Sequence, residues 1–224
     1  MHDTLVDISA GQAPRLKSFS LTHFQYQDGD HFGMLLALIS LAPIFLIVSE
    51  TSIILSRREM AGVLLLLGQL LNELFNLIIK LIIREPRPHE HLGDGYGMPS
   101  SHAQFMGFFV VYVVVYLETR VVMHQVHRRV VQAGSLVLGG LVLISRVYLG
   151  YHTVRQVLAG TIVGAGAGAV WYALVENWLR SSGAIDWAVN SSMCRWLLVR
   201  DSRDIPNIAL AEYNLSMSAK PKVL

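Results

Sequence analysis

Two histidines in the sequence could perform acid–base or nucleophilic chemistry on a phosphate group. Gln156 follows His152 at the fourth position, so on a helix the two side chains would lie on one face. A neutral imidazole can attack phosphorus and form a phosphohistidine, and a partner at its other nitrogen fixes the tautomer. The amide oxygen of Gln156 could accept that N–H, which gives it an orienting role. His102 opens an apolar run and could protonate a leaving oxygen, because imidazole titrates near neutrality.

Cations and hydroxyls around these histidines would suit a bound phosphate. Ser100 is placed as a helix N-cap, where free backbone N–H groups and the helix dipole favour an anion, and Ser101 adds a hydroxyl. Arg87 and Arg146 offer planar forks for phosphate oxygens, and Lys80 offers a point charge. Taken singly, each group also fits a plain capped helix or an anchor at lipid headgroups. Their convergence on one face of a membrane predicts an anion site.

Long apolar stretches must position these residues. Apolar residues make up 53% of the 224-residue chain and charged residues only 15%, whereas an ordinary soluble domain has about 25% charged residues. A bilayer core of about 30 Å is crossed by about 20 helical residues. The sequence therefore predicts an all-α integral membrane protein, a polytopic bundle of about five transmembrane helices. The predicted spans are residues 32–55, 60–83, 103–117, 130–149 and 154–178.

The chain divides into three predicted parts around these spans. Residues 1–31 form a polar N-terminal segment without the long apolar run of a cleavable signal peptide, and residues 32–180 form the transmembrane domain. Residues 181–224 form a C-terminal segment, in which the stretch 185–199 predicts an interfacial or re-entrant helix. A crossing by that stretch would move the C-terminus to the opposite side. In the fifth span, small residues recur at a four-residue period and predict a helix-packing face: Gly160, Gly164 and Gly168.

The distribution of arginine predicts the orientation. Short loops rich in Arg mark the cytoplasm, and two such loops join the first span to the second and the third to the fourth. They hold Arg57 and Arg58, and Arg120, Arg128 and Arg129, respectively. Alternation of the spans then places the loops that carry the two histidines on the lumenal or exterior side. With five spans the N-terminus is lumenal and the C-terminus is cytoplasmic.

Several other classes of function are not indicated. The net charge of +2 is too small to imply a nucleic-acid partner, and the single cysteine, Cys194, cannot form an internal disulfide. The sequence has no zinc or iron–sulfur spacing, and His89 and His91 have no third ligand nearby in the sequence. We therefore expect neither a metal nor a cofactor. The sequence does not indicate an oligomeric state.

Three motifs together resemble the signature of the type 2 phosphatidic acid phosphatase superfamily, which reads Lys-x6-Arg-Pro, Pro-Ser-Gly-His and Ser-Arg-x5-His-x3-Asp. The first motif matches in full from Lys80 to Pro88. Ser101 stands where the family has Gly, and Gln156 stands where it has Asp. These departures, together with Glu85-Pro-Arg-Pro and the tail that follows residue 200, are similar to the dolichyldiphosphatase branch. The resemblance covers residues 24–213.

This resemblance implies a metal-independent membrane phosphatase in the endoplasmic reticulum, with a lumenal active site. The branch converts dolichyl diphosphate, released by oligosaccharide transfer, to dolichyl phosphate and so recycles the lipid carrier of N-glycosylation. The implied partners are a polyprenyl diphosphate and the lipid bilayer. The implied roles are His152 as nucleophile and His102 as general acid, with the phosphoryl group held by Lys80, Arg87, Ser100, Ser101 and Arg146.

Alternatives remain open at this point. The substrate could be another lipid phosphate, such as phosphatidate, a sphingoid phosphate or undecaprenyl diphosphate. A non-enzymatic protein that binds prenyl phosphates would need the cations but not two histidines. Gln156 cannot stabilise an imidazolium by charge, so either the reaction tolerates that or a nearby acid, Glu85 or Asp94, compensates.

Overall fold

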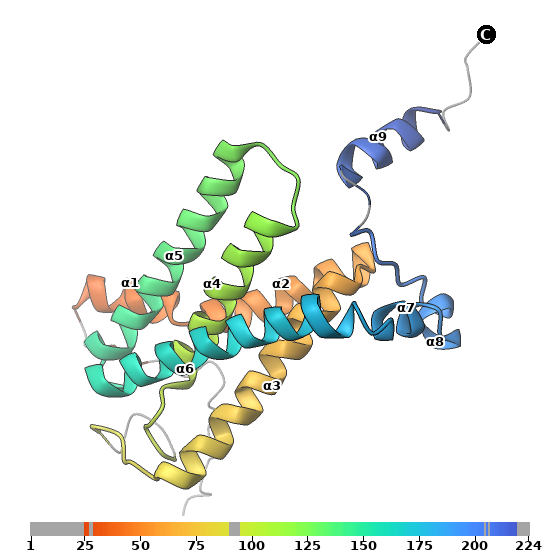
Figure 1. The fold of residues 1–224 in the computed structure, drawn as a ribbon. Coiled ribbons are helices and arrows are strands. Elements are labelled where there is room, and N and C mark those ends of the chain that lie inside the picture. The colour runs from red at the N-terminus through yellow and green to blue at the C-terminus, as the bar shows by residue number, and fades with distance from the viewer. Residues whose placement is uncertain (1–24, 27–28, 90–94, 204, 206, 219–224) are drawn as a thin grey trace, which may run out of the picture.

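The computed structural model describes residues 25–26, 29–89, 95–203, 205 and 207–218, and Figure 1 shows their arrangement. Within these residues the regular elements are helices, and five helical stretches are long and apolar enough to cross a membrane. The predicted bundle of about five transmembrane helices is therefore confirmed. The spans are His31–Arg57, Met60–Ile83, Ser101–Thr119, Gln125–Tyr148 and Val154–Leu179.

The first span consists of two helices, whereas the sequence predicts one continuous helix over residues 32–55. Helix α1 covers His31–Ile39 and helix α2 covers Ala42–Arg57. The break follows from Pro43, which has no N–H to donate to the carbonyl of Ile39 and whose ring crowds that carbonyl. The side chain of Asp30 accepts a hydrogen bond from the backbone of α1 and another, of 3.1 Å, from the Tyr148 hydroxyl. The start of the chain's first span is therefore attached to the end of the fourth.

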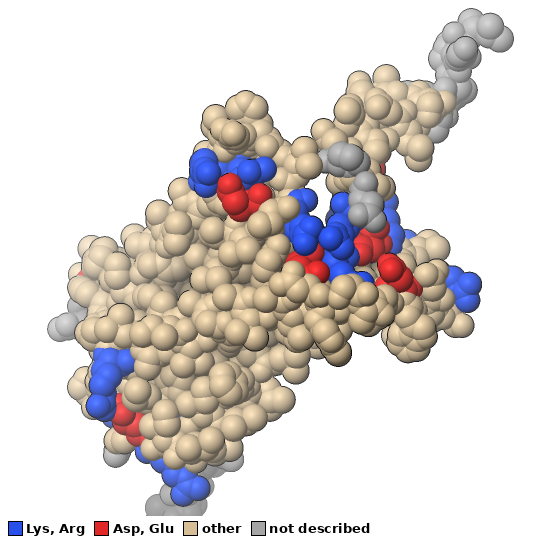
Figure 2. Space-filling model, in the orientation of Figure 1, with Lys and Arg blue, Asp and Glu red and all other residues tan. Residues whose placement is uncertain are grey.

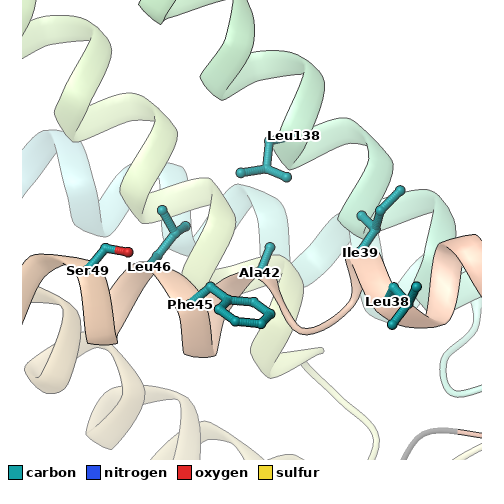
Figure 3. A pocket seen from close by; sticks show the side chains of 7 residues that line it. All are labelled: Leu38, Ile39, Ala42, Phe45, Leu46, Ser49 and Leu138. Carbon is teal, nitrogen blue, oxygen red and sulfur yellow. The ribbon is translucent and has the colours of Figure 1, made fainter.

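The bend between α1 and α2 leaves an apolar crevice of about 290 Å³ beside α5, which covers Gln125–Tyr148. Figure 3 shows Leu138 of α5 facing the side chains of the two bent helices. The crevice is lined by Leu38, Ile39, Ala42, Phe45, Leu46, Ser49 and Leu138.

Helix α4, Ser101–Thr119, lies at the centre of the bundle and contacts α3, α5 and α6. Helix α3 covers Met60–Ile83, and α6 covers Val154–Ala173 before it continues as the π-helix η2 over Leu174–Leu179. A Cβ atom on Gly164 would collide with the backbone of Gln104 in α4, and one on Gly160 would lie 2.6 Å from the Ser100 carbonyl oxygen. The predicted packing face of α6 is confirmed, because only glycine permits this approach.

Buried amide side chains join α3 to α4 within the apolar bundle. The Gln104 amide donates to Asn72 Oδ1 at 2.9 Å, and the Asn76 amide donates to Gln104 Oε1 at 2.8 Å. Each amide thus satisfies another in a region where water cannot. The column of amides leads along α3 toward Lys80, one helical turn beyond Asn76.

The C-terminal segment contains the short helices α7 (Ala184–Val189) and α8 (Ser192–Trp196), followed by α9 (Ile208–Ser218). Beyond α8 the chain returns to the loop between α2 and α3, where Arg200 N donates to the Arg58 carbonyl and Met60 N donates to the Arg200 carbonyl, both at 2.9 Å. Residues 185–199 therefore leave and re-enter the same end of the bundle. Trp187 and Trp196 are 78% and 82% exposed, which suits the interfacial region of a bilayer.

Charged residues gather at the two ends of the molecule, and Figure 2 shows an uncharged band between them on the face that it presents. One end holds the ion pairs of the α2–α3 loop with the tail, including Arg200 with Glu59 at 2.7 Å. The opposite end holds Arg155 with Glu85, also at 2.7 Å. This distribution matches a bundle that crosses a bilayer with its loops in water.

The close approach of α6 to α4 gives a testable consequence for stability. Gly164→Ala places a methyl group against the Gln104 backbone, and we expect overpacking of about 2 kcal/mol, or about 5 °C in Tm. Gly166→Ala is the matched control on the same helix, since nothing lies within 4 Å of its added Cβ atom, and it should leave Tm unchanged or slightly raised. Thermal unfolding in detergent measures both variants. Equal Tm values for the two would contradict the close packing.

Candidate active site

The sequence-predicted site residues come together at one end of the bundle. Helices α3 and α5 end there, α4 and α6 begin there, and the connecting loops supply the remaining residues (Figure 1). Charge–charge coupling joins His102 and His152 to each other and to the same three cations. The residues assembled there are Lys80, Arg87, Ser100, Ser101, His102, Arg146, His152 and Gln156.

His152 lies in the loop between α5 and α6 and is only 4% exposed. Its Nδ1 atom is 3.2 Å from Gln156 Oε1, and its backbone N–H donates to the Arg146 carbonyl. The same Gln156 oxygen also accepts from the backbone N–H of Thr153, the N-cap of α6, at 3.3 Å. An amide oxygen only accepts, so the proton of the neutral ring is on Nδ1 and the lone pair is on Nε2.

The environment of His152 keeps its ring uncharged. Burial, together with the positive charges of Arg87 and Arg146, lowers the pKa of His152 to about 3, and the hydrogen bond with Gln156 only partly opposes this shift. A ring with that pKa is neutral throughout the physiological range. His152 therefore has the protonation state that a nitrogen nucleophile requires.

His102 occupies the first turn of α4 and is partly buried. Ser100 immediately precedes the helix as its N-cap, as the sequence predicts, but its hydroxyl does not bond the helix backbone. That hydroxyl is fully buried and has no hydrogen-bond partner among the residues that the structure describes. A buried hydroxyl beside the free N–H groups of a helix start is suited to an anion.

Ser101 contacts protein groups on both sides. Its hydroxyl accepts from Lys80 Nζ at 2.5 Å and donates to Asn76 Oδ1 at 3.0 Å. Lys80 is thereby attached to the amide column between α3 and α4. Asn76 is not among the site residues predicted from the sequence, although its four-residue spacing from Lys80 on one helix face is a usable signal.

Arg146, in the last turn of α5, is 6% exposed and lies with its guanidinium carbon 4.1 Å above the centre of the Tyr151 ring. The Tyr151 hydroxyl in turn accepts from the backbone N–H of Gln25. A cation–π contact of this kind offsets part of the cost of burying a charge. Tyr151 is not among the site residues predicted from the sequence, because a tyrosine near a helix end also fits a membrane interface.

Of the two acids considered as compensating groups, Glu85 contacts Gln156. The Gln156 amide donates to Glu85 Oε1 at 2.9 Å, and Arg155 donates to Glu85 Oε2 at 2.7 Å. The hydrogen bond from Gln156, followed by the bond and charge of Arg155, holds the pKa of Glu85 below its usual range. Asp94 lies outside the described residues, as does His91.

Within the described part of the chain, no group of three or more His, Cys, Asp or Glu side chains is arranged to hold a metal ion. The charged groups around the two histidines are instead cations. The expectation that the protein works without a metal remains a prediction.

Comparison with known proteins adds independent findings. The model of the PAP2 superfamily matches residues 61–180. Dolichyldiphosphatase 1 of Homo sapiens is 40% identical over 212 residues, which cover 88% of this chain and 87% of that protein. Lipid phosphate phosphatase gamma of Arabidopsis thaliana is 34% identical over 92% of this chain and 93% of its own length.

A solved structure supports the fold. The crystal structure of a transmembrane PAP2-type phosphatidylglycerolphosphate phosphatase from Bacillus subtilis matches with a TM-score of 0.56 at 24% identity, over 66% of this chain and 79% of that one. Fold and site together define a multi-pass membrane hydrolase of the phosphatase class. The chain belongs to the PAP2 superfamily and, within it, to the dolichyldiphosphatase family.

The protonation state of His152 can be tested directly. We expect its ¹³C-histidine NMR signal, assigned by its loss in His152→Ala, to remain that of a neutral ring between about pH 5 and 8. Arg87→Met removes one of the charges that lower its pKa, so the titration should move upward toward that of a free histidine. A wild-type titration near pH 6.5 would contradict the buried, cation-surrounded position.

Proposed function

We propose that the protein hydrolyses dolichyl diphosphate to dolichyl phosphate and inorganic phosphate. The observation that carries the proposal is the geometry of His152, a buried neutral imidazole whose Nδ1–H is held by Gln156 and whose Nε2 is available beside a cluster of cations. The names of the relatives support the substrate, since dolichyldiphosphatase 1 of Homo sapiens is 40% identical over most of both chains.

In the first step, His152 Nε2 attacks the terminal phosphorus and forms the P–N bond. The bond from that phosphorus to the bridging oxygen breaks, and His102, which takes up a proton against the negative charge of the bound diphosphate, donates it to the leaving oxygen of dolichyl phosphate. In the second step, water attacks the phosphohistidine while His102, now neutral, takes the proton of the water. The P–N bond breaks, inorganic phosphate leaves and both histidines return to their starting states.

The cations stabilise the charge that moves during these steps. In the proposal, Lys80, Arg87 and Arg146 surround the non-bridging oxygens of the transferred group, and the Ser100 hydroxyl donates to one of them. Ser101 contributes chiefly by holding Lys80, with which it shares a 2.5 Å hydrogen bond. Donors that are fixed before the reaction are the main source of electrostatic stabilisation in acyl- and phosphoryl-transfer sites. Three cations supply the charge that a metal ion provides elsewhere, so the proposed reaction is metal-independent.

We place the active site on the lumenal face of the endoplasmic reticulum membrane, where the reaction would recycle the lipid carrier for N-glycosylation. The support is the arginine content of the loops at the other end of the bundle, away from the active site. Arg57 and Arg58 lie in the α2–α3 loop, and Arg200 of the tail contacts that loop. Short loops rich in arginine remain cytoplasmic.

A second candidate substrate class is favoured by one comparison. The Arabidopsis relative named lipid phosphate phosphatase gamma is 34% identical over nearly the whole chain. A monoester lipid phosphate such as phosphatidate would use the same cations and histidines. It differs in its leaving group, an alkoxide rather than a phosphate, which depends more strongly on protonation by His102.

Phosphate release by the purified protein in detergent, with chelator present, tests the function. We expect release from dolichyl diphosphate to exceed that from phosphatidate, and His152→Ala to reduce it by about 10³-fold or more, because the nucleophile is gone. His127→Ala is the matched control, an exposed histidine at the opposite end of the bundle, and it should retain full activity.

Each result has a definite meaning. Loss of wild-type activity on chelation would contradict metal independence. Greater release from phosphatidate would move the assignment to the second substrate class. Strong release by His152→Ala would exclude the phosphohistidine route.

The orientation is tested in sealed endoplasmic-reticulum vesicles with a membrane-impermeant maleimide. In a Cys194→Ser background, His89→Cys near the site should be protected until detergent opens the vesicle, because it faces the lumen. Arg203→Cys near the tail should be labelled at once, because it faces the cytoplasmic side. Both positions are exposed in the structure, so each cysteine can react when the maleimide reaches it. The reverse pattern would show that the active site is cytoplasmic.

A further inference from the structure

The Gln156 side chain makes more hydrogen bonds than orienting one histidine requires. Its Oε1 atom accepts from His152 and from the backbone of Thr153, and its amide nitrogen donates to Glu85 Oε1 and to the Pro86 carbonyl, each at 2.9 Å. The side chain is 1% exposed. Both ends of the amide are therefore satisfied inside the protein.

These contacts fix which way the amide faces. If the amide were reversed, its nitrogen would face the N–H of Thr153 and its oxygen would face two acceptors, Glu85 and the Pro86 carbonyl. Favourable contacts at both ends would be replaced by donor–donor and acceptor–acceptor contacts. Glu85 is thus one of the two groups that keep the amide oxygen, rather than its nitrogen, toward His152.

Gly97 closes the space around this amide. A Cβ atom on Gly97 would lie 2.7 Å from Gln156 Nε2 and 2.9 Å from the Pro86 carbonyl oxygen. The backbone of Gly97 also donates to the Glu85 carbonyl at 2.7 Å. The backbone of Gly97 therefore packs directly on the amide, with no room for a side chain between them.

We propose that Glu85 is a positioning residue that supplies, through the Gln156 amide, the negative charge that the family's Asp would place directly beside the histidine. The inference rests on the proposed function of His152 as nucleophile. The connected groups are the Glu85 carboxylate, the Gln156 N–H and C=O, and the His152 Nδ1–H. Glu85 touches neither the substrate nor the reacting nitrogen.

The charge matters when the phosphohistidine forms. Bonding of Nε2 to phosphorus while Nδ1 keeps its proton leaves the imidazole ring positively charged. A neutral amide opposes this charge only by its dipole, and donation of its N–H to a carboxylate makes its oxygen a stronger acceptor. Glu85 is suited to this role because the hydrogen bond from Gln156, the largest cause, holds the pKa of Glu85 below its usual range and so keeps it ionised at neutral pH.

A purely structural role for Glu85 is the competing explanation. Arg155 donates to the other Glu85 oxygen, and the pair could serve only to attach the loop after α3 to helix α6. The Arg155 side chain is 74% exposed, however, so its ion pair is screened by water and contributes little. A variant without Arg155 loses the ion pair that could attach the loop but keeps the Glu85 carboxylate beside Gln156. It therefore distinguishes the two roles.

The test compares an isosteric variant of Glu85 with a variant that removes its outer ion pair. Glu85→Gln keeps an acceptor for the Gln156 amide but removes the charge, and we expect kcat to fall by about 10–100-fold with little change in KM. Arg155→Gln removes the outer ion pair and should change kcat by less than about threefold. Rapid quenching with substrate labelled at the terminal phosphate should show slower formation of the phosphoenzyme in Glu85→Gln. Unfolding in detergent confirms that both variants are folded.

Exchanging the carboxylate of Glu85 and the amide of Gln156 tests whether the lost activity can be restored. The double variant Glu85→Gln with Gln156→Glu keeps the number of heavy atoms and moves the carboxylate next to His152, as in the family pattern. We expect it to regain at least about tenfold in kcat over Glu85→Gln alone, because the charge now acts directly. A side chain that serves only to attach the loop would not be rescued in this way.

Several outcomes would overturn the proposal. The first is full activity of Glu85→Gln. The second is an equal loss of activity in Glu85→Gln and Arg155→Gln. The third is a double variant that is folded but regains no activity over a folded Glu85→Gln. The wild type and His152→Ala are assayed in parallel. If the wild type is active and His152→Ala is not, an unaffected Glu85→Gln overturns this inference alone, whereas an inactive wild type overturns the proposed function.

Discussion

The site depends on the close crossing of helices α4 and α6. Gly160 and Gly164 of α6 lie against the backbone of α4 with no room for a side chain, and the Ser100 N–H donates to the Gln156 carbonyl at 3.1 Å. This contact fixes the starts of the two helices side by side. His102 lies in the first turn of α4, and His152 precedes Thr153, the N-cap of α6, so the crossing positions the proposed acid relative to the proposed nucleophile. A wider crossing would separate both histidines from each other and from the cations.

Helix packing brings the site residues together, whereas the charges of the three cations tend to push them apart. Lys80, Arg87 and Arg146 repel one another at the edge of an apolar bundle, where charge is weakly screened. Neutral groups hold two of them: Ser101 accepts from Lys80, and the face of the Tyr151 ring lies under Arg146. The charge of Glu73, on α3, opposes this repulsion at Lys80, but one carboxylate among three cations still leaves an excess of positive charge for the proposed diphosphate. Burial, followed by the charges of Arg87 and Arg146, lowers the pKa of His152, so two of the cations proposed to bind the anion also favour the neutral ring that the proposed nucleophile requires.

Much of this arrangement is predictable from short-range patterns. Hydropathy predicts the five spans, the four-residue spacing of glycine predicts the packing face of α6, and alternation of the spans predicts which loops meet. The remaining features depend on contacts between residues distant in the sequence. The break before α2 had a local signal in Pro43, but that Ser101 would hold Lys80, and that Glu85 rather than Asp94 would reach Gln156, depends on how the loop after α3 folds over α6. Glu85 and Gln156 are separated by 71 positions, beyond the reach of any periodicity.

The position of Glu85, in the loop after α3, explains how Gln156 can stand where the family has Asp. A carboxylate in direct contact with His152 would have to be desolvated in a closed space, where an unpaired charge is costly. A neutral amide at that position avoids the cost, and the carboxylate instead occupies a position where its side chain is 22% exposed and Arg155 can pair with it. In the proposed mechanism the amide passes on part of the effect of that charge, because its N–H donates to Glu85 while its C=O accepts from His152. On the proposed mechanism, Gln156 stabilises the phosphorylated ring less directly than Asp would. In return, the resting His152 stays neutral, buried and in one tautomer without a buried carboxylate beside it.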